Sequence, residues 1–550
     1  MTQTHLKTRR WWNRRTRTLV WTTAGILLPL NYLAWHIFGW PAPIRISYET
    51  TRLTSPLTPD GYVDYLSVFR ENLQMGSGDF TDDPWFVLFE NERDLTRTPE
   101  YPRRNRPRPP GTENIVYHDP VTVFTENLGV EKPSIEDQQM IREFEVGILE
   151  QRMRVPFSAA DNPLLASVIE GNKAWYDAVV NTYKPTPLPV QYPEATDPHG
   201  EQAVRMVLLP IHQHCRALAQ RFRLRSMYRA GQGDLNGALD DMAFTWKMAA
   251  RMDDCCLVST SCATAIELHA TPATIRQVLA ASKLTPEFCS RIETLPQGST
   301  FPALVKQLNE IERFMCLDDI QGLYAGRCDG TSWLTDSGIK FTGRLAKLKS
   351  RRFWHAVNWN QVLEEQNQYF DAAVAASRLP TWQEQQAAME KLRNDPSYAG
   401  INASSEINSA PPSSVSDPTH LLQQVLLQRR WAWLGDPIQL AHLRDVRRRV
   451  VQIVARLAMW RQVHGQFPDD LQSILTVDGF STARPELLTD PFTGSQLGYE
   501  KQLNGFVLSS VGPNMQKDGA GFEECAIHET DLSDRSRPED DHIWRWPPAE

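Results

Sequence analysis

The sequence lacks the short motifs by which many catalytic sites are recognised. It has no Gly-Lys dipeptide, so the phosphate-binding loop with its lysine is absent. It also has no His-Glu-x-x-His, Gly-x-Ser-x-Gly or Cys-x-x-Cys, which excludes the familiar signatures of zinc proteases, serine hydrolases, thioredoxin-like proteins and haem attachment. We therefore predict no catalytic residues and no organic cofactor, and we favour a protein that is not an enzyme.

Residue types that ligate metals stand close together at His212, His214 and Cys215. On a helix the two histidines would point about 200° apart, and Cys215 falls on the apolar stripe. The pattern indicates a core cysteine with two surface histidines. The eight cysteines of the chain follow no spacing typical of a disulfide framework, so disulfide pairing stays open.

Charge is missing from one long stretch near the N-terminus. Residues 18–44 contain no Asp, Glu, Lys or Arg, whereas the 17 residues before them carry six cations and no acid. As a helix, residues 18–40 would be about 34 Å long, enough to cross a hydrocarbon core of roughly 30 Å. The pattern predicts a basic cytoplasmic tail over residues 1–17 and a single transmembrane anchor over residues 18–40. A mean hydropathy of −0.43 excludes a protein with many membrane spans.

A cleaved signal peptide is the alternative interpretation of residues 18–40. The run ends in His-Ile-Phe-Gly-Trp-Pro over residues 36–41, which offers no small-x-small cleavage site, so we favour an uncleaved anchor. The cations before the span place the N-terminus in the cytoplasm. The bulk of the chain is then expected outside the inner membrane, in a bacterial periplasm.

The charge of this bulk argues against one class of partner. Without the six cations of the tail, 52 basic residues stand against 66 acidic ones, a net charge of −14. Such a body repels phosphate backbones, so nucleic acid is excluded as a partner. The expected partners are the membrane and another protein of the envelope; whether a small molecule binds stays open.

Residues 131–435 have the periodicity of helices, with few strand signals. We predict an irregular membrane-proximal segment over residues 41–130, a helical body over residues 131–330, and a helical continuation over residues 331–435 with a disordered loop at 395–418. Helices are expected near residues 135–152, 163–183, 201–230, 257–282, 285–295, 302–325, 339–378, 381–394 and 419–433.

One helical pair in this body has a recognisable pattern. Cys215, Leu218 and Phe222 fall on one helix face, the turn Gly-Gln-Gly-Asp follows at residues 231–234, and a second stripe runs from Leu239. The pair resembles a tetratricopeptide-type hairpin. No 34-residue recurrence accompanies it, so the sequence predicts a single hairpin and no repeat array.

The C-terminal part differs in composition from the helical body. A helix ends at His464-Gly465, the turns Phe-Pro-Asp-Asp at 467–470 and Asp-Pro-Phe-Thr-Gly at 490–494 follow, and Asn504-Gly505 separates two strand-like runs at 496–500 and 506–511. This order predicts a β-hairpin in a small α+β module over residues 436–528. An acidic tail is expected over residues 529–550.

This module resembles the globular head of the major pseudopilin of type II secretion over about residues 436–525. The likeness rests on the order helix, Gly-x-Phe-Pro, Asp-Pro-Phe-x-Gly, hairpin and Gly-Phe-x-Leu-x-Ser-x-Gly-Pro-Asn. The helix before the head is rich in arginine, so it cannot lie in a bilayer or a pilus core, and no pilus is predicted. The layout of the whole chain is also similar to uncharacterised membrane-anchored proteins of bacteria such as planctomycetes.

The resemblance to a pseudopilin head implies a calcium site in the loop after the last strand of the hairpin. Asn514 stands where family members often have an acid, and Asp518 lies in the same loop. Calcium is therefore the one metal expected, with Asn514 and Asp518 as ligands. A loop that is ordered without metal is the alternative.

The sequence as a whole predicts a mainly α protein with a single transmembrane helix, an extracytoplasmic multi-helix body and the small C-terminal module. The function expected is that of a membrane-anchored scaffolding or interaction protein of the bacterial envelope, linked to a secretion or pilus-like assembly. An envelope enzyme with a dispersed active site is the alternative.

Overall fold

The computed structural model describes more than half of the chain. The described residues are 42–72, 155–183, 209–252, 256–281, 284–295, 300–327, 353–395, 417–434, 437–477, 480, 484–515, 522–523 and 542–546. The predicted anchor, most of the membrane-proximal segment, the interior of the loop at 395–418 and Asp518 lie outside them. None of the described helices is long and apolar enough to cross a membrane.

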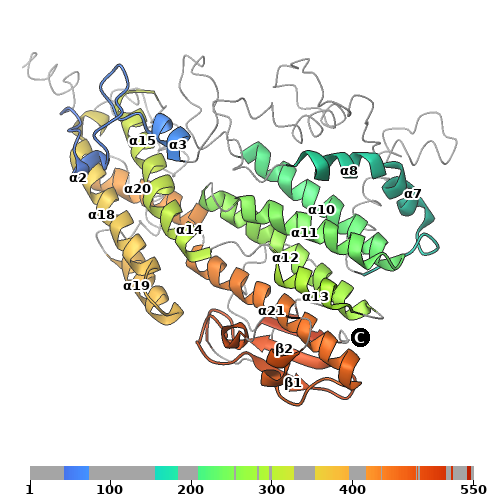
Figure 1. Cartoon of the computed structure of the whole chain (residues 1–550). Helices are drawn as coiled ribbons and strands as arrows, with labels where there is room; N and C mark the ends of the chain where they lie inside the picture. Colours follow the sequence, from blue (N-terminus) through green and yellow to red (C-terminus); the bar gives the residue numbers. More distant parts are fainter. Residues whose placement is uncertain are drawn as a thin grey trace, which may run out of the picture. The chain divides into compact units, whose positions relative to one another are not determined.

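Helices dominate the described residues, and one small sheet accompanies them (Figure 1). The α-helices are α2 (Tyr48–Thr51), α3 (Tyr65–Asn72), α7 (Pro163–Gly171), α8 (Lys173–Thr182), α10 (Leu209–Gly231), α11 (Leu235–Met252), α12 (Leu257–Ala280), α13 (Pro286–Glu293), α14 (Thr300–Lys306), α15 (Arg313–Tyr324), α18 (Trp359–Ser377), α19 (Trp382–Asn394), α20 (Pro418–Leu434) and α21 (Pro437–His464). The other elements are the π-helix η3 (Gln307–Glu312), the 3-10 helices η5 (Leu471–Thr476) and η6 (Pro485–Leu488), and the strands β1 (Gly498–Lys501), β2 (Phe506–Ser510), β3 (Phe522–Glu523) and β4 (His542–Trp546). The predicted mainly α fold with a small sheet is confirmed.

The chain divides into two compact units. One comprises the described residues within Met1–Val63, Leu317–Gln368 and Asp395–Ala432, and the other those within Asp64–Cys316, Tyr369–Asn394 and Trp433–Glu550. The first unit is held by polar contacts between distant segments. Asn367 donates to the carbonyl oxygens of Glu49 and Thr50 at 2.9 and 2.8 Å, and the backbone N–H of Val63 donates to Oε1 of Gln321 at 3.0 Å.

The second unit is built on α10, α11, α12 and α21, which pack in succession (Figure 1). Cys215, Leu218 and Phe222 of α10 are buried, as the predicted stripe requires, and they share a core with aromatic residues of α8 and α11. The predicted turn between α10 and α11 is also present. Gly233 adopts a φ of +83°, a conformation that favours glycine. The Asp234 carboxylate accepts from the backbone N–H of Gly237 at 2.9 Å, close to the start of α11.

Three expected helices are interrupted, and the one predicted over 339–378 breaks at residues 357–358, just before α18. The helix predicted over 163–183 breaks at Asn172, which is buried and donates its side-chain amide to the carbonyl of Val168 at 2.9 Å. The helix predicted over 302–325 contains the π-helix η3, which turns Gln307 and Glu312 toward α12. There Glu312 accepts from the backbone N–H of Leu257 at 2.9 Å, and this places a carboxylate at the N-terminus of α12.

The C-terminal part begins with α21 and continues into the sheet, whose strand order is β1-β2-β4-β3. The predicted hairpin is confirmed, because β1 and β2 pair antiparallel from Gly498 opposite Ser509 to Lys501 opposite Phe506. Strand β4 lies in the stretch that was expected to be an acidic tail. It pairs antiparallel with β2, and the short β3 pairs with it in parallel.

Residues of the turn motifs connect this sheet to the helices. Asp490 is buried, and its carboxylate accepts from the backbone N–H groups of Phe492 and Val511, both at 3.0 Å. The rings of Phe492, Trp382 and His442 all contact one another, and the indole N–H of Trp382 donates to the carbonyl of Pro513 at 2.9 Å. The Asp-Pro-Phe-Thr-Gly and Gly-Pro-Asn segments are thus explained by packing against α19 and α21.

Candidate functional site

A cavity of about 850 Å³ opens in the second unit between α8, α10, α11 and α13. Its volume falls in the range that ligand sites commonly have. We call it the α8–α13 pocket. Four cations and three carboxylates line it together with apolar and amide side chains: Asp177, Val180, Asn181, Tyr183, Arg225, Arg229, Leu239, Asp240, Asp241, Ala243, Phe244, Lys247, Arg291, Thr294 and Leu295.

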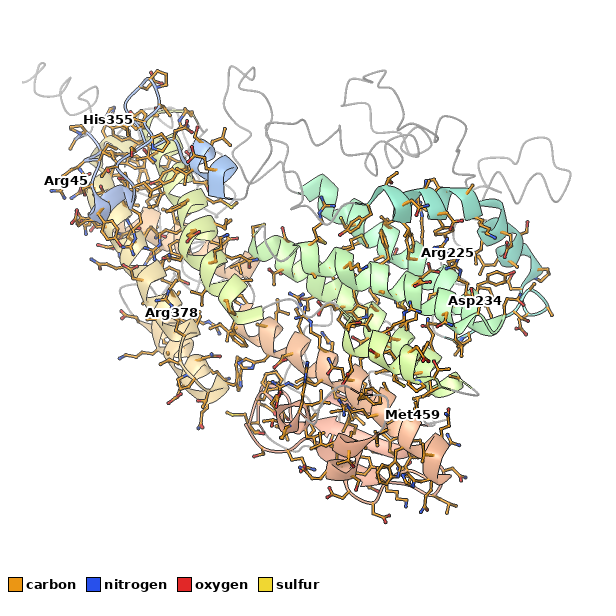
Figure 2. The ribbon with its side chains drawn as sticks, in the orientation of Figure 1. Arg45, Arg225, Asp234, His355, Arg378 and Met459 are labelled. Atoms are coloured by element: carbon orange, nitrogen blue, oxygen red, sulfur yellow. The ribbon has the colours of Figure 1, made fainter. Side chains whose placement is uncertain are left out.

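Helical spacing explains how these side chains meet. On α10, Arg225 and Arg229 are four residues apart and therefore occupy one face. On α11, Asp240, Phe244 and Lys247 recur at i, i+4 and i+7, which makes a second face. Figure 2 marks Arg225 on α10 and Asp234 where α10 gives way to α11. The hairpin thus aligns a cationic face with a mixed charged and aromatic one.

The floor of the pocket is the ion pair of Arg225 and Asp241. Nε of Arg225 donates to both carboxylate oxygens at 3.1 and 2.9 Å, and Nη2 donates to Oδ1 at 2.5 Å. The guanidinium group also lies over the rings of Tyr176 and Phe222, 4.3 and 5.0 Å from their centroids. Side-chain exposure is 4% for Arg225 and 1% for Asp241, so the pair is fixed from every side.

Burial raises the pKa of Asp241 to about 6, although Arg225 and Arg229 both oppose this shift. Arg229 reaches Oδ1 of Asp241 at 3.2 Å and also donates to the carbonyl of Gly237 at 3.0 Å. Both oxygens of Asp241 are therefore hydrogen-bonded to arginine. Such a carboxylate is a poor general base despite its pKa, because its lone pairs already face donors.

The rim of the pocket is more exposed and is also charged. Arg291 of α13 pairs with Asp240 and donates to Asn236. Asp177 of α8 is half exposed and meets Nη1 of Arg225 at 3.4 Å. Lys247 is exposed and forms no ion pair with another described residue. The rim therefore carries both paired and solvent-exposed charges.

A second, much smaller hollow lies beside α10 and α12. Arg216, Arg223 and His269 line it together with Thr245. Burial lowers the pKa of His269 to about 3, and the nearby cations Arg223 and Arg216 lower it further. The imidazole is therefore neutral at physiological pH.

A buried ion cluster joins α12 to α21. Glu267 is fully buried and accepts from Arg444 at 2.5 and 3.0 Å and from Arg448 at 2.6 Å. Burial alone would raise the pKa of Glu267, but the two guanidinium groups outweigh it and the pKa is lowered. Arg456, which also lies on α21, pairs with Glu293 of α13. This cluster ties helices together and opens into neither hollow.

The site residues expected from sequence are only partly within the described residues. Asn514 lies in the turn after β2, whereas Asp518 lies outside the described residues, so the calcium site stays a prediction. In the described part of the chain, no three His, Cys, Asp or Glu side chains are placed to hold a metal ion. Cys215 is buried in the core, as expected, and burial raises its pKa to about 12.

Comparisons of the chain with models of known protein families, with curated proteins and with solved structures give no match. The geometry of the α8–α13 pocket therefore carries the functional argument.

Sequence reasoning missed the residues of the pocket and of the buried cluster. A signal was present in each case. Glu267 is the one acid in the largely apolar α12, and Asp241 stands directly before Met242 of the buried stripe on α11. A carboxylate on a buried helix face requires a partner. The sequence alone does not reveal which of its many arginines that partner is.

Proposed function

We propose that this protein is a membrane-anchored extracytoplasmic binding and scaffolding protein of the bacterial envelope, and that the α8–α13 pocket is its site of interaction. The apolar stretch at residues 18–40 and the cations before it support an anchor in the inner membrane with the N-terminus in the cytoplasm. The net charge of −14 that follows supports a protein partner over nucleic acid.

One observation carries the choice of binding over catalysis. The carboxylate in the pocket with a shifted pKa, Asp241, is bound through both oxygens to arginines and is almost fully buried. A general acid or base must reach the proton it transfers, and Asp241 cannot. Fixed charges and apolar walls in a cavity of about 850 Å³ instead suit recognition of a ligand.

The proposed link to a secretion or pilus-like assembly rests on the resemblance of residues 436–528 to a pseudopilin head. Supporting it are the helix α21, the turn at Asp490 and the hairpin of β1 and β2, which follow one another in the order on which the resemblance was based. A calcium ion held by Asn514 and Asp518 belongs to the same proposal.

The proposed function is tested by purifying partners from membranes with the full-length chain as bait. Deleting residues 436–550 would be a poor variant, because it removes α21 and leaves Glu267 buried without its arginines. Ala243→Leu is better suited, since it extends an apolar side chain into the pocket and keeps a good helix former. Ala387→Leu makes the same change on an exposed position of α19 and serves as the control.

The expected result is a set of envelope proteins that copurify with the wild type and with Ala387→Leu but are lost with Ala243→Leu. Equal recovery in all three samples would contradict a role for the pocket in binding a partner. Turnover of a small molecule by the purified protein, abolished by Ala243→Leu, would favour the alternative of an envelope enzyme.

A further inference from the structure

Among the described residues that line the α8–α13 pocket, one cation has no carboxylate partner and is available to a ligand. Each of the three carboxylates contacts an arginine: Asp241 contacts Arg225 and Arg229, Asp177 contacts Arg225, and Asp240 contacts Arg291. Lys247 is the fourth cation of the lining, and within the described residues no carboxylate lies within ion-pair distance of its Nζ. A ligand that carries an acid would complete this set of pairs.

The spacing of the lining residues along α11 indicates how long a bound ligand can be. Asp240 and Lys247 are seven residues apart on one helix, which corresponds to a separation of about 10 Å. Ala243 and Phe244 lie between them and provide an apolar wall. An extended peptide advances about 3.3 Å per residue, so the stretch accommodates roughly three residues.

The residues that α8 and the end of α13 contribute to the lining suit a polypeptide backbone and an apolar side chain. Asn181 presents an amide with both a donor and an acceptor, and Val180 beside it is 40% exposed, an unusual position for a large apolar residue of this chain. Leu295 adds a further apolar surface on the side of α13. The lining of the cavity therefore combines polar and apolar groups.

This combination of polar and apolar groups favours a peptide over a simple amphiphile as the ligand. A hydrocarbon tail in the pocket would remove water from the ion pairs of Asp240 and Asp177 without offering them a hydrogen bond, which is costly. A peptide carries amide groups at every residue and can hydrogen-bond to a mixed wall. We propose that the α8–α13 pocket binds a short extended peptide segment of a partner, in which an acidic side chain pairs with Lys247 and a neighbouring apolar side chain packs against Ala243 and Phe244.

This inference rests on the proposed binding function and names the chemistry of the ligand. It is tested by immobilising the peptide Ser-Gly-Glu-Leu-Gly-Ser on a sensor, with forms in which Gln or Lys replaces Glu, and measuring binding of the detergent-solubilised full-length protein. The Glu peptide is expected to bind about fivefold tighter than the Gln peptide at low salt, and the difference should shrink as salt rises.

Two variants distinguish the charge pair with Lys247 from a general loss of peptide binding. Lys247→Glu is expected to reverse the preference, so that the Lys peptide binds tighter than the Glu peptide, whereas Ala243→Leu weakens all three peptides. Lys173→Glu is the matched control: the residue is exposed, lies at the start of α8 outside the pocket, and an acid is favourable there, so the order of the three peptides should not change.

A preference for the Glu peptide that persists in Lys247→Glu would overturn the proposal. So would binding of laurate, an amphiphile without amides, that is lost with Ala243→Leu while none of the peptides binds. If Ala243→Leu still abolishes capture of membrane partners in either case, the proposed binding function stands and only the peptide ligand is wrong.

Discussion

Asp241 and Glu267 are both buried carboxylates that contact two arginines, and yet their pKa values move in opposite directions. Two features distinguish their surroundings: the nearby charge of Asp240 raises the pKa of Asp241, and the arginine partners differ in burial. Arg444 and Arg448 are both buried around Glu267, whereas of the partners of Asp241 only Arg225 is, and Arg229 is 22% exposed. A charge without enough close compensation is destabilised by desolvation, and protonation relieves it.

Asp241 predicts a distinctive pH dependence of stability. Its pKa rises from 3.8 to about 6 on folding, so its contribution to stability is complete below about pH 4 and is lost as the pH rises through 6. Relative to Asp241→Asn, the free energy of unfolding of the wild type should fall by about 3 kcal/mol between these limits. Urea titrations at several pH values measure this. Arg225, Arg229 and Asp240 surround the side chain in both proteins. Parallel pH profiles of the wild type and Asp241→Asn would contradict the prediction.

The contribution of Glu267 to stability should depend on pH in the opposite direction. Glu267→Gln leaves two buried arginines without a counter-charge and should cost about 3–5 kcal/mol in the free energy of unfolding at neutral pH. Because the pKa of Glu267 is lowered from 4.5, the advantage of the wild type is present above pH 4.5 and disappears as the pH falls through the lowered value. Glu390→Gln, at an exposed position of α19, is the control and should change stability by less than about 0.5 kcal/mol.

At the scale of elements, strand β4 is the part of the C-terminal sheet that sequence patterns did not reveal. Its central residue Trp544 is buried and lies opposite Leu508 of β2, itself buried. The acidic residues before β4 concealed five residues with strand character. A strand whose partner lies elsewhere in the chain carries no turn signal that would mark it as part of a hairpin.

Trp544→Ala should therefore destabilise the C-terminal sheet. Loss of a fully buried tryptophan costs about 3–5 kcal/mol, and amides of β1 and β2 should exchange with deuterium much faster in the variant. Hydrogen exchange followed by mass spectrometry reads this out by segment. Leu503→Ala, at a side chain that is 98% exposed in the hairpin turn, is expected to leave exchange unchanged. Equal protection in wild type and Trp544→Ala would show that β4 is not part of the folded sheet.

Helices could be predicted from the sequence far better than the contacts between them. The predicted bounds of α12, α13 and α19 agree with the structure to within a few residues. The helices α13 and α19 each bury one face, which is the pattern that a 3.6-residue periodicity detects. The helix α21 shows that the contacts of a helix cannot be predicted in this way. It is rich in arginine, yet Arg444, Arg447, Arg448 and Arg456 are buried. Which face of a helix is buried depends on acids of other helices, and that information is not local.

The pocket was missed for the same reason. Its charges come from α8, α10, α11 and α13, whose sequences each read as ordinary amphipathic or capped helices. Only their packing places Lys247, Ala243 and Asn181 around one cavity. A single sequence contains the residues of such a site but no spacing that reveals it.

At the scale of the whole molecule, the distribution of charge predicts which side of the membrane the bulk of the chain occupies. A phosphatase that is active only outside the cytoplasm, fused after Glu550, should be active in cells and inactive when residues 18–40 are deleted. A reporter that folds only in the cytoplasm should show the reverse. An inactive phosphatase on the intact chain would contradict the proposed orientation.

The buried pair of Glu267 and Arg444 also affects when the helical body can fold during synthesis of the chain. The two residues are 177 positions apart in the chain. At 5–20 residues per second, a ribosome needs roughly 10–35 seconds to progress from one to the other. During that interval α12 has been made, but the arginines that neutralise its acid have not. Burial of Glu267 would be costly until then, so the helical body cannot adopt its final packing before α21 has been synthesised.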